Sequence, residues 1–252
     1  MDDIAEFPSS KSSPVYCKQL INWEMDLMKQ ADIVLCSSEY LKEKVISRSG
    51  INREVHIINN AISLPQIRHF DSFPSKVQDA INLLKSLKCS LLYIGTISQW
   101  FDFKLICEAL DKKEDVQLVL IGPKDCDIPS HKQIHYIGSV ERQYIYSLME
   151  QASALVMPFI VNELIRSVNP VKMYEYIYME KPIIAPHYGE MEKFLPYINL
   201  YHDNDEFMSL VDQLSKSELQ ISSEKGNEMK GFAEKNTWES RYEEVKKILF
   251  NV

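Results

Sequence analysis

Short apolar runs alternate with amphipathic segments along most of this chain. The strand-like runs are residues 33–36, 55–58, 91–94, 116–121, 134–137, 154–157, 183–185 and 195–201. The segments with helical periodicity are residues 15–30, 39–46, 102–110, 141–151, 205–214 and 236–250. Regular alternation of strands and helices is typical of a parallel sheet with right-handed crossovers. The pattern therefore predicts an α/β fold with helices on both faces of a parallel sheet.

Three of the predicted strands run directly into a glycine. They are followed by Gly95, Gly122 and Gly138, three of only seven glycines in the chain. Open α/β sheets bind ligands at the carboxyl ends of their parallel strands, and a glycine there lets the backbone approach a ligand closely. A plain strand-to-loop turn explains any one of these glycines equally well. Their shared position favours a ligand crevice.

The stretch from residue 162 to 186, NELIRSVNPVKMYEYIYMEKPIIAP, predicts a loop, a capped helix and a buried strand. We expect Asn169 to accept the first free helix amides. Pro170 suits the first helical position because it has no amide to leave unpaired. The apolar stripe of this helix is expected to pack inward. Its other face is expected to remain free for a ligand.

That second face carries Lys172 and Glu175, three positions apart. A helix start with unpaired amides and a lysine one turn inward favours a bound phosphate. A carboxylate one turn further repels phosphate, but its oxygens can accept hydrogen bonds from the vicinal hydroxyls of a ribose. The pattern therefore indicates a nucleotide diphosphate laid along the helix. Taken alone, such a pair is more often an ordinary solvated ion pair.

Composition and charge narrow the classes of partner. The chain has 252 residues, 45% of them hydrophobic and 25% charged, as in an ordinary soluble globular protein. Its net charge of -8, without a block rich in Lys or Arg, opposes nonspecific nucleic-acid binding. The five cysteines are an odd number without CxxC spacing, so they are expected to be reduced. With no apolar run near the ~20 residues of a membrane span and an acidic start unlike a signal peptide, a cytoplasmic protein is predicted, at most peripheral at a membrane.

Several common chemistries lack their motif. The chain has no GxGxxG, GxxxxGK[ST] or GxSxG, so standard dinucleotide dehydrogenases, P-loop hydrolases and the usual serine hydrolases lack support. His131 and His135 with Asp125 and Asp127 have the chemistry of metal ligands. They straddle a loop and a strand, however, and ordinary loop polarity explains them better.

Seven segments, taken in order, carry a resemblance to a known family. They are ADIVLCSSEYLKEKV, VHIINNAI, YIGTISQWFDFKLI, VQLVLIGP, IHYIGSV, ASALVMPF and NPVKMYEYIYMEKPIIAP. Their order and spacing resemble the group 1 (family 4-like) glycosyltransferases of the GT-B fold, in particular the teichuronic-acid and capsular-polysaccharide enzymes. The resemblance covers nearly the whole chain from about Ala31 onward.

The resemblance implies two Rossmann-like domains that face each other across a cleft. The C-terminal domain of this family holds a nucleotide-diphosphate sugar without a metal ion, so no metal cofactor is expected. On this basis residues 1–64 are a remnant of the N-terminal acceptor domain with the linker. Residues 65–235 are the donor domain, and residues 236–252 are the helix that crosses back.

The resemblance also implies roles for individual residues. Glu175 matches the family's glutamate on the nucleotide ribose, and Arg166 is a candidate for a second positive charge on the leaving diphosphate, beside Lys172. The remaining residues expected at the substrate are Asn169 and Pro170 near the diphosphate, Gly95 and Thr96 at the sugar-phosphate loop, Gly122 at its strand end, and Gly138 with Val140 beside the base.

Three features depart from the family pattern. Ser167 stands where many members have a second glutamate, eight positions before Glu175. Glu180 replaces a glycine and would be strained if the left-handed turn is kept. The acceptor domain is incomplete, so the strand at 33–36 is expected to leave an unpaired apolar edge. Another chain, a homo-oligomer or the rest of a longer protein would then cover this edge.

The function predicted from these observations is transfer of a sugar from a nucleotide-diphosphate sugar to a saccharide or lipid-linked acceptor in cell-surface polysaccharide synthesis. The chain is then a donor-binding part that needs a complementary half for activity. Two alternatives stay open: a non-catalytic partner or gene fragment that keeps the fold, and a sugar-nucleotide epimerase.

Overall fold

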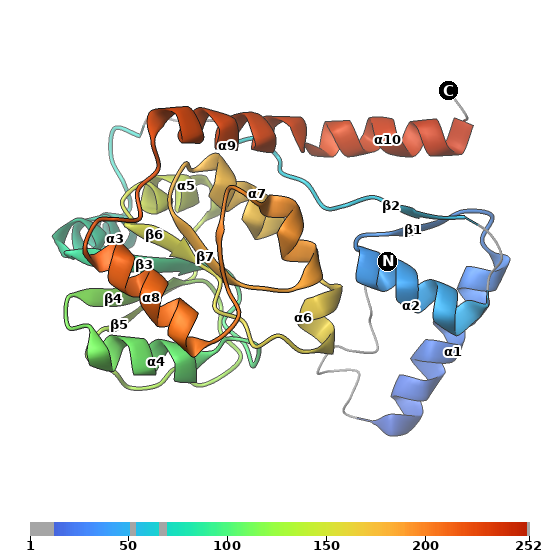
Figure 1. Ribbon diagram of the computed structural model, residues 1–252, viewed down its shortest axis with the longest axis horizontal. Helices are drawn as coiled ribbons and strands as arrows, with labels where there is room; N and C mark the ends of the chain where they lie inside the picture. Colours follow the sequence, from blue (N-terminus) through green and yellow to red (C-terminus); the bar gives the residue numbers. More distant parts are fainter. Residues whose placement is uncertain (1–12, 51–53, 66–69, 251–252) are drawn as a thin grey trace.

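The computed structural model describes residues 13–50, 54–65 and 70–250. Residues 1–12, 51–53, 66–69 and 251–252 lie outside these ranges. The described chain forms a six-stranded parallel sheet covered by helices and a separate two-stranded parallel sheet (Figure 1). The predicted α/β fold is confirmed.

The large sheet has the strand order β5-β4-β3-β6-β7-β8. Its strands are β3 (Cys89–Ile94), β4 (Val116–Ile121), β5 (Ile134–Gly138), β6 (Ala154–Val156), β7 (Ile183–Pro186) and β8 (Asn199–Tyr201). The chain proceeds outward in one direction from β3 and in the other from β6, so the connections diverge between these two neighbours. In such sheets the crevice beyond this divergence point is where ligands bind.

The sheet is buried on both faces because its strands are apolar at consecutive positions. All six residues of β3 are buried. Leu92 and Ile94 belong to a core with α3 (Ser75–Ser86), α5 (Ile145–Met149), α7 (Val171–Tyr178) and α9 (Ser223–Lys235). Leu91 and Tyr93 belong to a second core with α4 (Phe103–Lys112) and α8 (Asn204–Ser215). Successive side chains of a strand point to opposite faces of the sheet. The two cores, each with its own helices, therefore lie on opposite faces.

The two-stranded sheet belongs to a smaller N-terminal unit. It consists of α1 (Pro14–Gln30), β1 (Val34–Cys36), α2 (Glu39–Ser49) and β2 (Val55–Ile57). Ser38 caps the start of α2, since its hydroxyl accepts a hydrogen bond from the amide of Leu41 at 3.2 Å. The core of this unit comprises Met28, Val34, Cys36, Leu41, Val45 and Val55.

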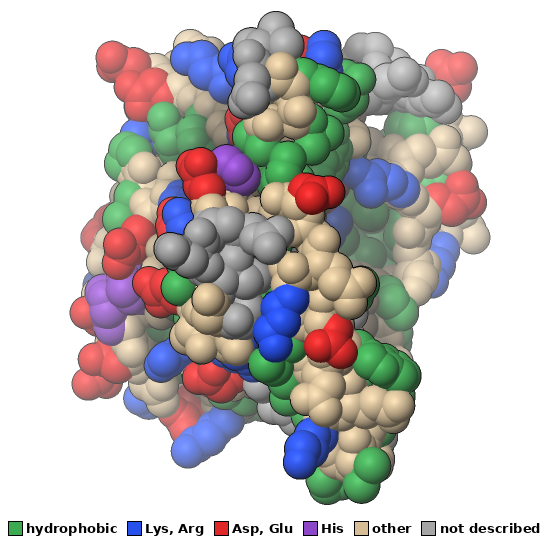
Figure 2. Space-filling model, turned by 90° about the vertical axis from the view of Figure 1, so that its right-hand side faces the viewer, with side chains coloured by type: hydrophobic (Ala, Val, Ile, Leu, Met, Phe, Trp, Pro, Cys, Tyr) green, Lys and Arg blue, Asp and Glu red, His purple; other side chains and the backbone are tan. Residues whose placement is uncertain are grey.

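Within the described residues, β1 pairs with β2 alone. Two of its three side chains, however, are buried in the small core, so the strand itself does not expose an apolar face. Helices α1 and α10 (Trp238–Phe250) do carry exposed apolar side chains. These include Val15, Tyr16, Trp23 and Leu27 on α1, and Trp238, Tyr242, Leu249 and Phe250 on α10. Figure 2 views the molecule from the side on which α1 and the end of α10 lie in Figure 1. It shows hydrophobic side chains gathered at several places on that side.

Helices α9 and α10 follow one another along one edge of the molecule (Figure 1). Asn236 and Glu239 have the spacing of a capping pair, which the sequence predicts at the start of α10, but Asn236 caps the preceding helix instead. Asn236 is the C-terminal cap of α9, and its side chain donates to the carbonyl of Phe232 at 2.8 Å. The hydroxyl of Thr237 accepts from the amide of Ser240 at 3.2 Å and takes the capping role.

Other boundaries also differ from the prediction. Segment 141–151 divides into a 3-10 turn, η3 (Arg142–Tyr144), and the short α5. The predicted strand at 195–201 begins only at residue 199, after the 3-10 segment η4 (Gly189–Phe194) and a turn. Helices α3, α9 and the short α6 (Glu163–Ser167) were not predicted. None of the helices in the described ranges is both long enough and apolar enough to cross a bilayer.

Candidate functional site

A cavity of about 490 Å³ opens beyond the carboxyl ends of β3 and β4. Five residues predicted at the substrate line it, namely Gly95, Thr96, Gly122, Val140 and Lys172. Its walls are otherwise largely apolar, formed by side chains such as Trp100, Phe159, Leu164, Ile165 and Val168. The strand ends and the first turn of α7 therefore meet at one cavity, at the divergence point of the sheet.

The glycines at this cavity are required by the close packing of two loops. Gly122 has φ 140°, and a Cβ atom there would lie 2.0 Å from the carbonyl oxygen of Gly95. The amide of Gly95 donates to the carbonyl of Ile121 at 3.0 Å, which ties the two strand ends together. Gly138, with φ 80°, is not among the cavity-lining residues. Turn geometry thus explains Gly138, whereas Gly95 and Gly122 shape the cavity itself.

Glu175 is almost completely buried and binds two cations. Its Oε2 atom accepts from the Lys172 ammonium at 2.6 Å, and its Oε1 atom accepts from Nη2 of Arg142 at 3.2 Å. The carboxylate side chain is only 4% exposed, so this is not the solvated pair that the spacing alone suggests. The expectation of a free helix face is wrong at this position, because the loop after β5 brings Arg142 against it. A ligand that uses Glu175 must displace a cation or share the carboxylate with it.

The start of α7 differs from the prediction by one residue. Pro170 is the N-cap and Val171 the first helical residue, and no side chain of a described residue caps this end. Asn169 is therefore not the cap, which corrects the sequence-based assignment. Its amide side chain instead forms hydrogen bonds with Asn60 and Glu190.

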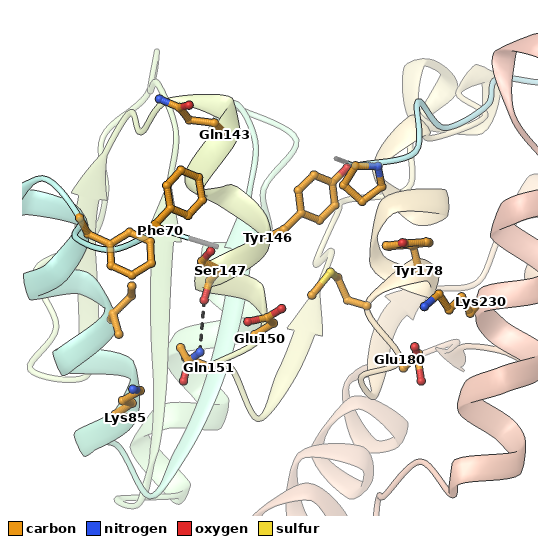
Figure 3. Close-up of a pocket in the computed structure, with 14 residues that line it drawn as sticks. Phe70, Lys85, Gln143, Tyr146, Ser147, Glu150, Gln151, Tyr178, Glu180 and Lys230 are labelled. Atoms are coloured by element: carbon orange, nitrogen blue, oxygen red, sulfur yellow. Dashed lines mark hydrogen bonds between the residues drawn. The ribbon is translucent and has the colours of Figure 1, made fainter. Parts of the chain in front are cut away.

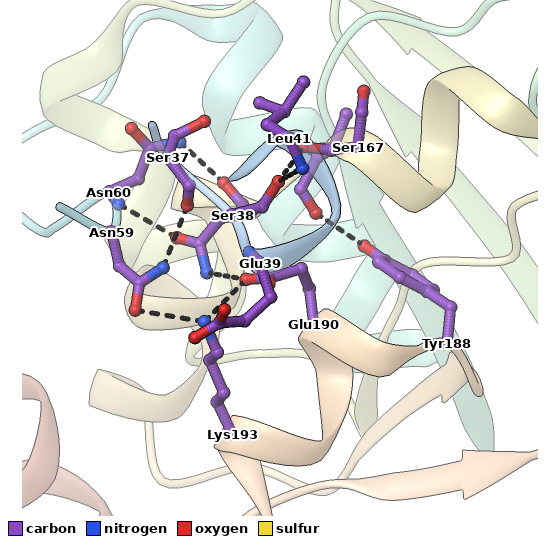
Figure 4. A network of polar contacts seen from close by, with 12 residues as sticks. Ser37, Ser38, Glu39, Leu41, Asn59, Asn60, Ser167, Tyr188, Glu190 and Lys193 are labelled. Carbon is purple, nitrogen blue, oxygen red and sulfur yellow. Dashed lines mark hydrogen bonds and ion pairs between the residues drawn. The ribbon is translucent and has the colours of Figure 1, made fainter. Parts of the chain in front are cut away.

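Asn169 belongs to a polar junction between the start of α7 and the N-terminal unit. Figure 4 shows its partners Asn60 and Glu190. Its Oδ1 accepts from the amide of Asn60 at 2.9 Å, and its Nδ2 donates to Oε2 of Glu190 at 3.1 Å. Glu190, which is 2% exposed, also accepts from the amide of Glu39 at the start of α2, at 2.8 Å, and pairs with Lys193 at 3.1 Å. A carboxylate at a helix start is stabilised by the free amides and the dipole. The sequence interpretation missed Glu190.

Ser167 belongs to the same junction. It is buried, its hydroxyl donates to the carbonyl of Leu164 at 2.7 Å, and its own carbonyl accepts from the hydroxyl of Ser38 at 2.8 Å. The position where many relatives have a second glutamate thus contributes here to the contact between the two units (Figure 4).

Arg166 is not brought together with Lys172. Its exposed side chain lines a neighbouring cavity of about 380 Å³, together with Glu39, Glu43 and His187 among others. The second cation that the structure places at Glu175 is Arg142, which the sequence interpretation missed. The predicted role of Arg166 on a diphosphate stays a prediction.

A further cavity of about 420 Å³ lies between α3, α5, the end of α7 and α9 (Figure 3). Tyr146, Tyr178, Glu150 and Lys230 are among its lining residues, and none of the predicted substrate residues is. Burial raises the pKa of the Tyr146 phenol, and the charge of nearby Glu175 raises it further. This phenol is therefore neutral at ordinary pH.

The side chains with metal-ligand chemistry are dispersed. His131 contacts Asp111 at 3.2 Å, and His135 contacts the side-chain oxygen of Gln117. Within residues 13–50, 54–65 and 70–250, no group of three His, Cys, Asp or Glu side chains is arranged to hold a metal ion.

Comparisons with known proteins identify one curated relative and many structures of the same fold. No family model matches the chain. The chain is 24% identical over 237 residues to a Bacillus subtilis (strain 168) protein named "Putative teichuronic acid biosynthesis glycosyltransferase TuaH". The match covers 89% of this chain and 58% of that protein, so the chain spans little more than half of the relative's length.

Solved structures share the fold at lower identity. The Anabaena protein Alr3699/HepE in complex with UDP-glucose has a TM-score of 0.70 and 13% identity, over 95% of this chain and 70% of that one. Sucrose-phosphate synthase from Thermosynechococcus elongatus has a TM-score of 0.70 and 14% identity, over 97% of this chain and 63% of that one. These neighbours are GT-B glycosyltransferases, so the GT-B fold expected from the sequence is confirmed.

Proposed function

We propose that this chain, which has the fold of a GT-B glycosyltransferase, is the donor-binding part of an enzyme of cell-surface polysaccharide synthesis. It transfers a sugar from a nucleotide-diphosphate sugar to a saccharide or lipid-linked acceptor. The observation that carries the proposal is the cavity at the divergence point of the sheet, where glycine-ended strands meet Lys172. The name of TuaH and the UDP-glucose complex of HepE support the substrate class.

In this proposal the diphosphate lies at the uncapped start of α7. The bond between the anomeric carbon and the diphosphate oxygen breaks, and its electron pair leaves with the diphosphate. The acceptor hydroxyl oxygen forms the new bond to that carbon and releases its proton to a base in the acceptor-binding half. Lys172 and the free helix amides stabilise the negative charge that develops on the leaving group. With these groups, and with Arg166 as the proposed second cation, no metal ion is required.

Glu175 has the complementary role of receiving the ribose hydroxyls. Lys172 occupies its Oε2 atom at 2.6 Å and also lines the cavity. A diphosphate in the cavity competes for the lysine and makes that carboxylate oxygen available. The largely apolar walls around Trp100 and Val140 are suited to the flat base.

The first experiment is calorimetry with UDP, GDP, CDP and their sugars. We expect the wild type to bind one nucleotide class. Lys172→Ala should weaken that binding at least tenfold, because it removes a charged hydrogen-bond donor from the diphosphate. Lys104→Ala removes an exposed lysine of α4, on the other face of the sheet, and serves as the matched control. Unchanged binding in Lys172→Ala would contradict the proposed role.

The second candidate is a non-catalytic partner that keeps the fold. The exposed apolar faces of α1 and α10 favour it, since they fit a second chain that supplies the remainder of an acceptor domain. A wild type that binds none of the three nucleotides would establish this alternative over the first. The epimerase alternative gains no support from the named relatives.

We also propose a cytoplasmic location, at most peripheral at the inner face of the membrane. Cys36 and Cys89 are buried free thiols, and Cys107 and Cys126 are free thiols as well. This state fits a reducing compartment.

A further inference from the structure

The carboxylate of Glu175 is bound by two cations that come from different parts of the fold. Lys172 lies one turn before it on α7, whereas Arg142 lies on η3, after the loop that leaves β5. Each cation binds a different carboxylate oxygen, Lys172 at Oε2 and Arg142 at Oε1. The two contacts can therefore be lost independently.

The two cations have different access to a bound ligand. Lys172 lines the cavity at the strand ends and is 31% exposed. Arg142 is 69% exposed and is not a lining residue, although Ser139 and Val140 of the preceding loop are. A diphosphate in the cavity meets the ammonium first. Lys172 is also the more mobile point charge, because a lysine has a flexible stem and three rotatable donors.

If Lys172 left Glu175, the buried carboxylate would keep only one of the two cations described above. Loss of one member of a buried ionic group is costly when the remaining charge stays unpaired. Arg142 then supplies the only cation still bound to Glu175 among the described contacts. It holds the Oε1 side of the carboxylate and leaves the Oε2 side facing the space that the ammonium has vacated.

We propose that Arg142 is a positioning residue that keeps Glu175 oriented toward the ribose hydroxyls after Lys172 has moved to the diphosphate. The proposal rests on the proposed function of this cavity. It assigns ribose recognition to a pair, Glu175 with Arg142, and diphosphate recognition to Lys172. The affinity for a ribonucleotide then depends on Arg142 mainly through the sugar hydroxyls.

The test measures discrimination between a ribose and a sugar without hydroxyls. Dissociation constants are determined for the nucleoside diphosphate that binds best among UDP, GDP and CDP, for its 2′,3′-dideoxy counterpart and for pyrophosphate. In the wild type we expect the dideoxy compound to bind at least tenfold more weakly, because hydrogen bonds to a charged group are lost. In Arg142→Ala this preference should fall about tenfold, with little change for the dideoxy compound and pyrophosphate.

Two further variants distinguish positioning from a structural effect. Arg142→Lys should recover most of the preference, because the contact with Glu175 is a single N–H···O bond that an ammonium can replace. Lys88→Ala removes an exposed cation paired with Asp115. The two residues directly precede β3 and β4, at the opposite ends of these strands from the cavity, so the change should leave the preference unchanged.

The outcomes distinguish failure of the positioning role from failure of the proposed function. An equal loss of affinity for all three ligands in Arg142→Ala overturns the positioning role, since it would reveal a general electrostatic effect. An unchanged preference overturns it as well. Failure of the wild type to bind any of the three nucleotides rejects the proposed function itself, whatever the variants show.

Discussion

Glu180 occupies a backbone conformation that disfavours its side chain. Its φ is 56°, in the left-handed region, directly after the last turn of α7. The family that the sequence resembles has a glycine at this position, where a left-handed turn is expected. This chain has a glutamate there, and the structure keeps the left-handed turn. A residue with a Cβ atom costs roughly 1–2 kcal/mol in this region, whereas glycine adopts it freely.

Glu180→Gly is therefore expected to stabilise the protein. The relief of strain exceeds the additional entropy of an unfolded glycine, so we expect a gain of about 0.5–1 kcal/mol in the free energy of unfolding. Urea titration should show a higher midpoint with an unchanged slope. Ser217→Gly, at the other non-glycine residue with positive φ among the described residues, should give a gain of similar size. A loss of stability in Glu180→Gly would mean that side-chain contacts with Gly226 outweigh the strain.

The residues of the site were predictable to the extent that they are close in sequence. Lys172 and Glu175 share a helix, and their spacing alone places both at one surface. Arg142 joins them from 33 positions before Glu175, through a loop whose path depends on the whole sheet. Asn169 was placed correctly beside the helix but with the wrong partners, because Asn60 and Glu190 compete for its side chain.

At the scale of elements, the edge strand β5 contains a histidine whose ionisation affects stability. Burial lowers the pKa of His135 below its usual value of 6.5, and its ring contacts Gln117 on β4. As the pH falls below 6.5, the unfolded chain binds a proton that the folded histidine still resists. The folded state therefore loses stability between pH 6.5 and the lower folded pKa, and the loss is constant below that value.

His135→Gln should reduce this pH dependence. The glutamine cannot titrate and can still reach Gln117, so the free energy of unfolding should fall less between pH 7.5 and 5.5 than in the wild type. Urea unfolding at the two pH values measures the difference. Equal decreases in the two proteins would show that other groups determine the pH response.

The elements were predicted best where periodicity is strong. The runs of β4 and β7 are apolar at nearly every position, and their bounds agree with the sequence within two residues. Helix α9 was missed because SEKGNEMKGFAEK contains two glycines and few apolar residues. Met229 and Ala233 nevertheless pack into the main core, and Gly226 lies directly against the side chain of Glu180. Tertiary contacts, which the sequence pattern does not show, stabilise this helix.

At the scale of the whole molecule, the N-terminal unit depends on the large one. Among the described residues its core has six buried side chains, whereas the two cores of the large sheet are several times larger. A core of this size cannot stabilise an independent unit. The junction of Asn60, Asn169 and Glu190, with the Ser38–Ser167 contact, therefore supplies much of what keeps the unit folded (Figure 4).

Glu190→Ala tests this dependence. The change removes the acceptor for the start of α2 and for Asn169, and leaves Lys193 without its buried partner. Lys193 is 31% exposed and can be solvated, so we expect a loss of about 2–3 kcal/mol, near the lower end for a broken buried pair. The loss should be local to the N-terminal unit, because Glu190 binds the two units to each other and lies outside the large sheet.

Native-state hydrogen exchange gives the required resolution. In Glu190→Ala the amides of β1, β2 and α2 should exchange faster, while those of β3 and β4 keep their wild-type protection. Glu192→Ala removes an exposed glutamate of the same 3-10 segment and should change neither group. Leu118→Ala, within the large sheet, should lower protection in both units, since the small unit cannot remain folded without its support. Faster exchange of β3 and β4 in Glu190→Ala would instead mean that the two units unfold together, with the junction as part of one cooperative core.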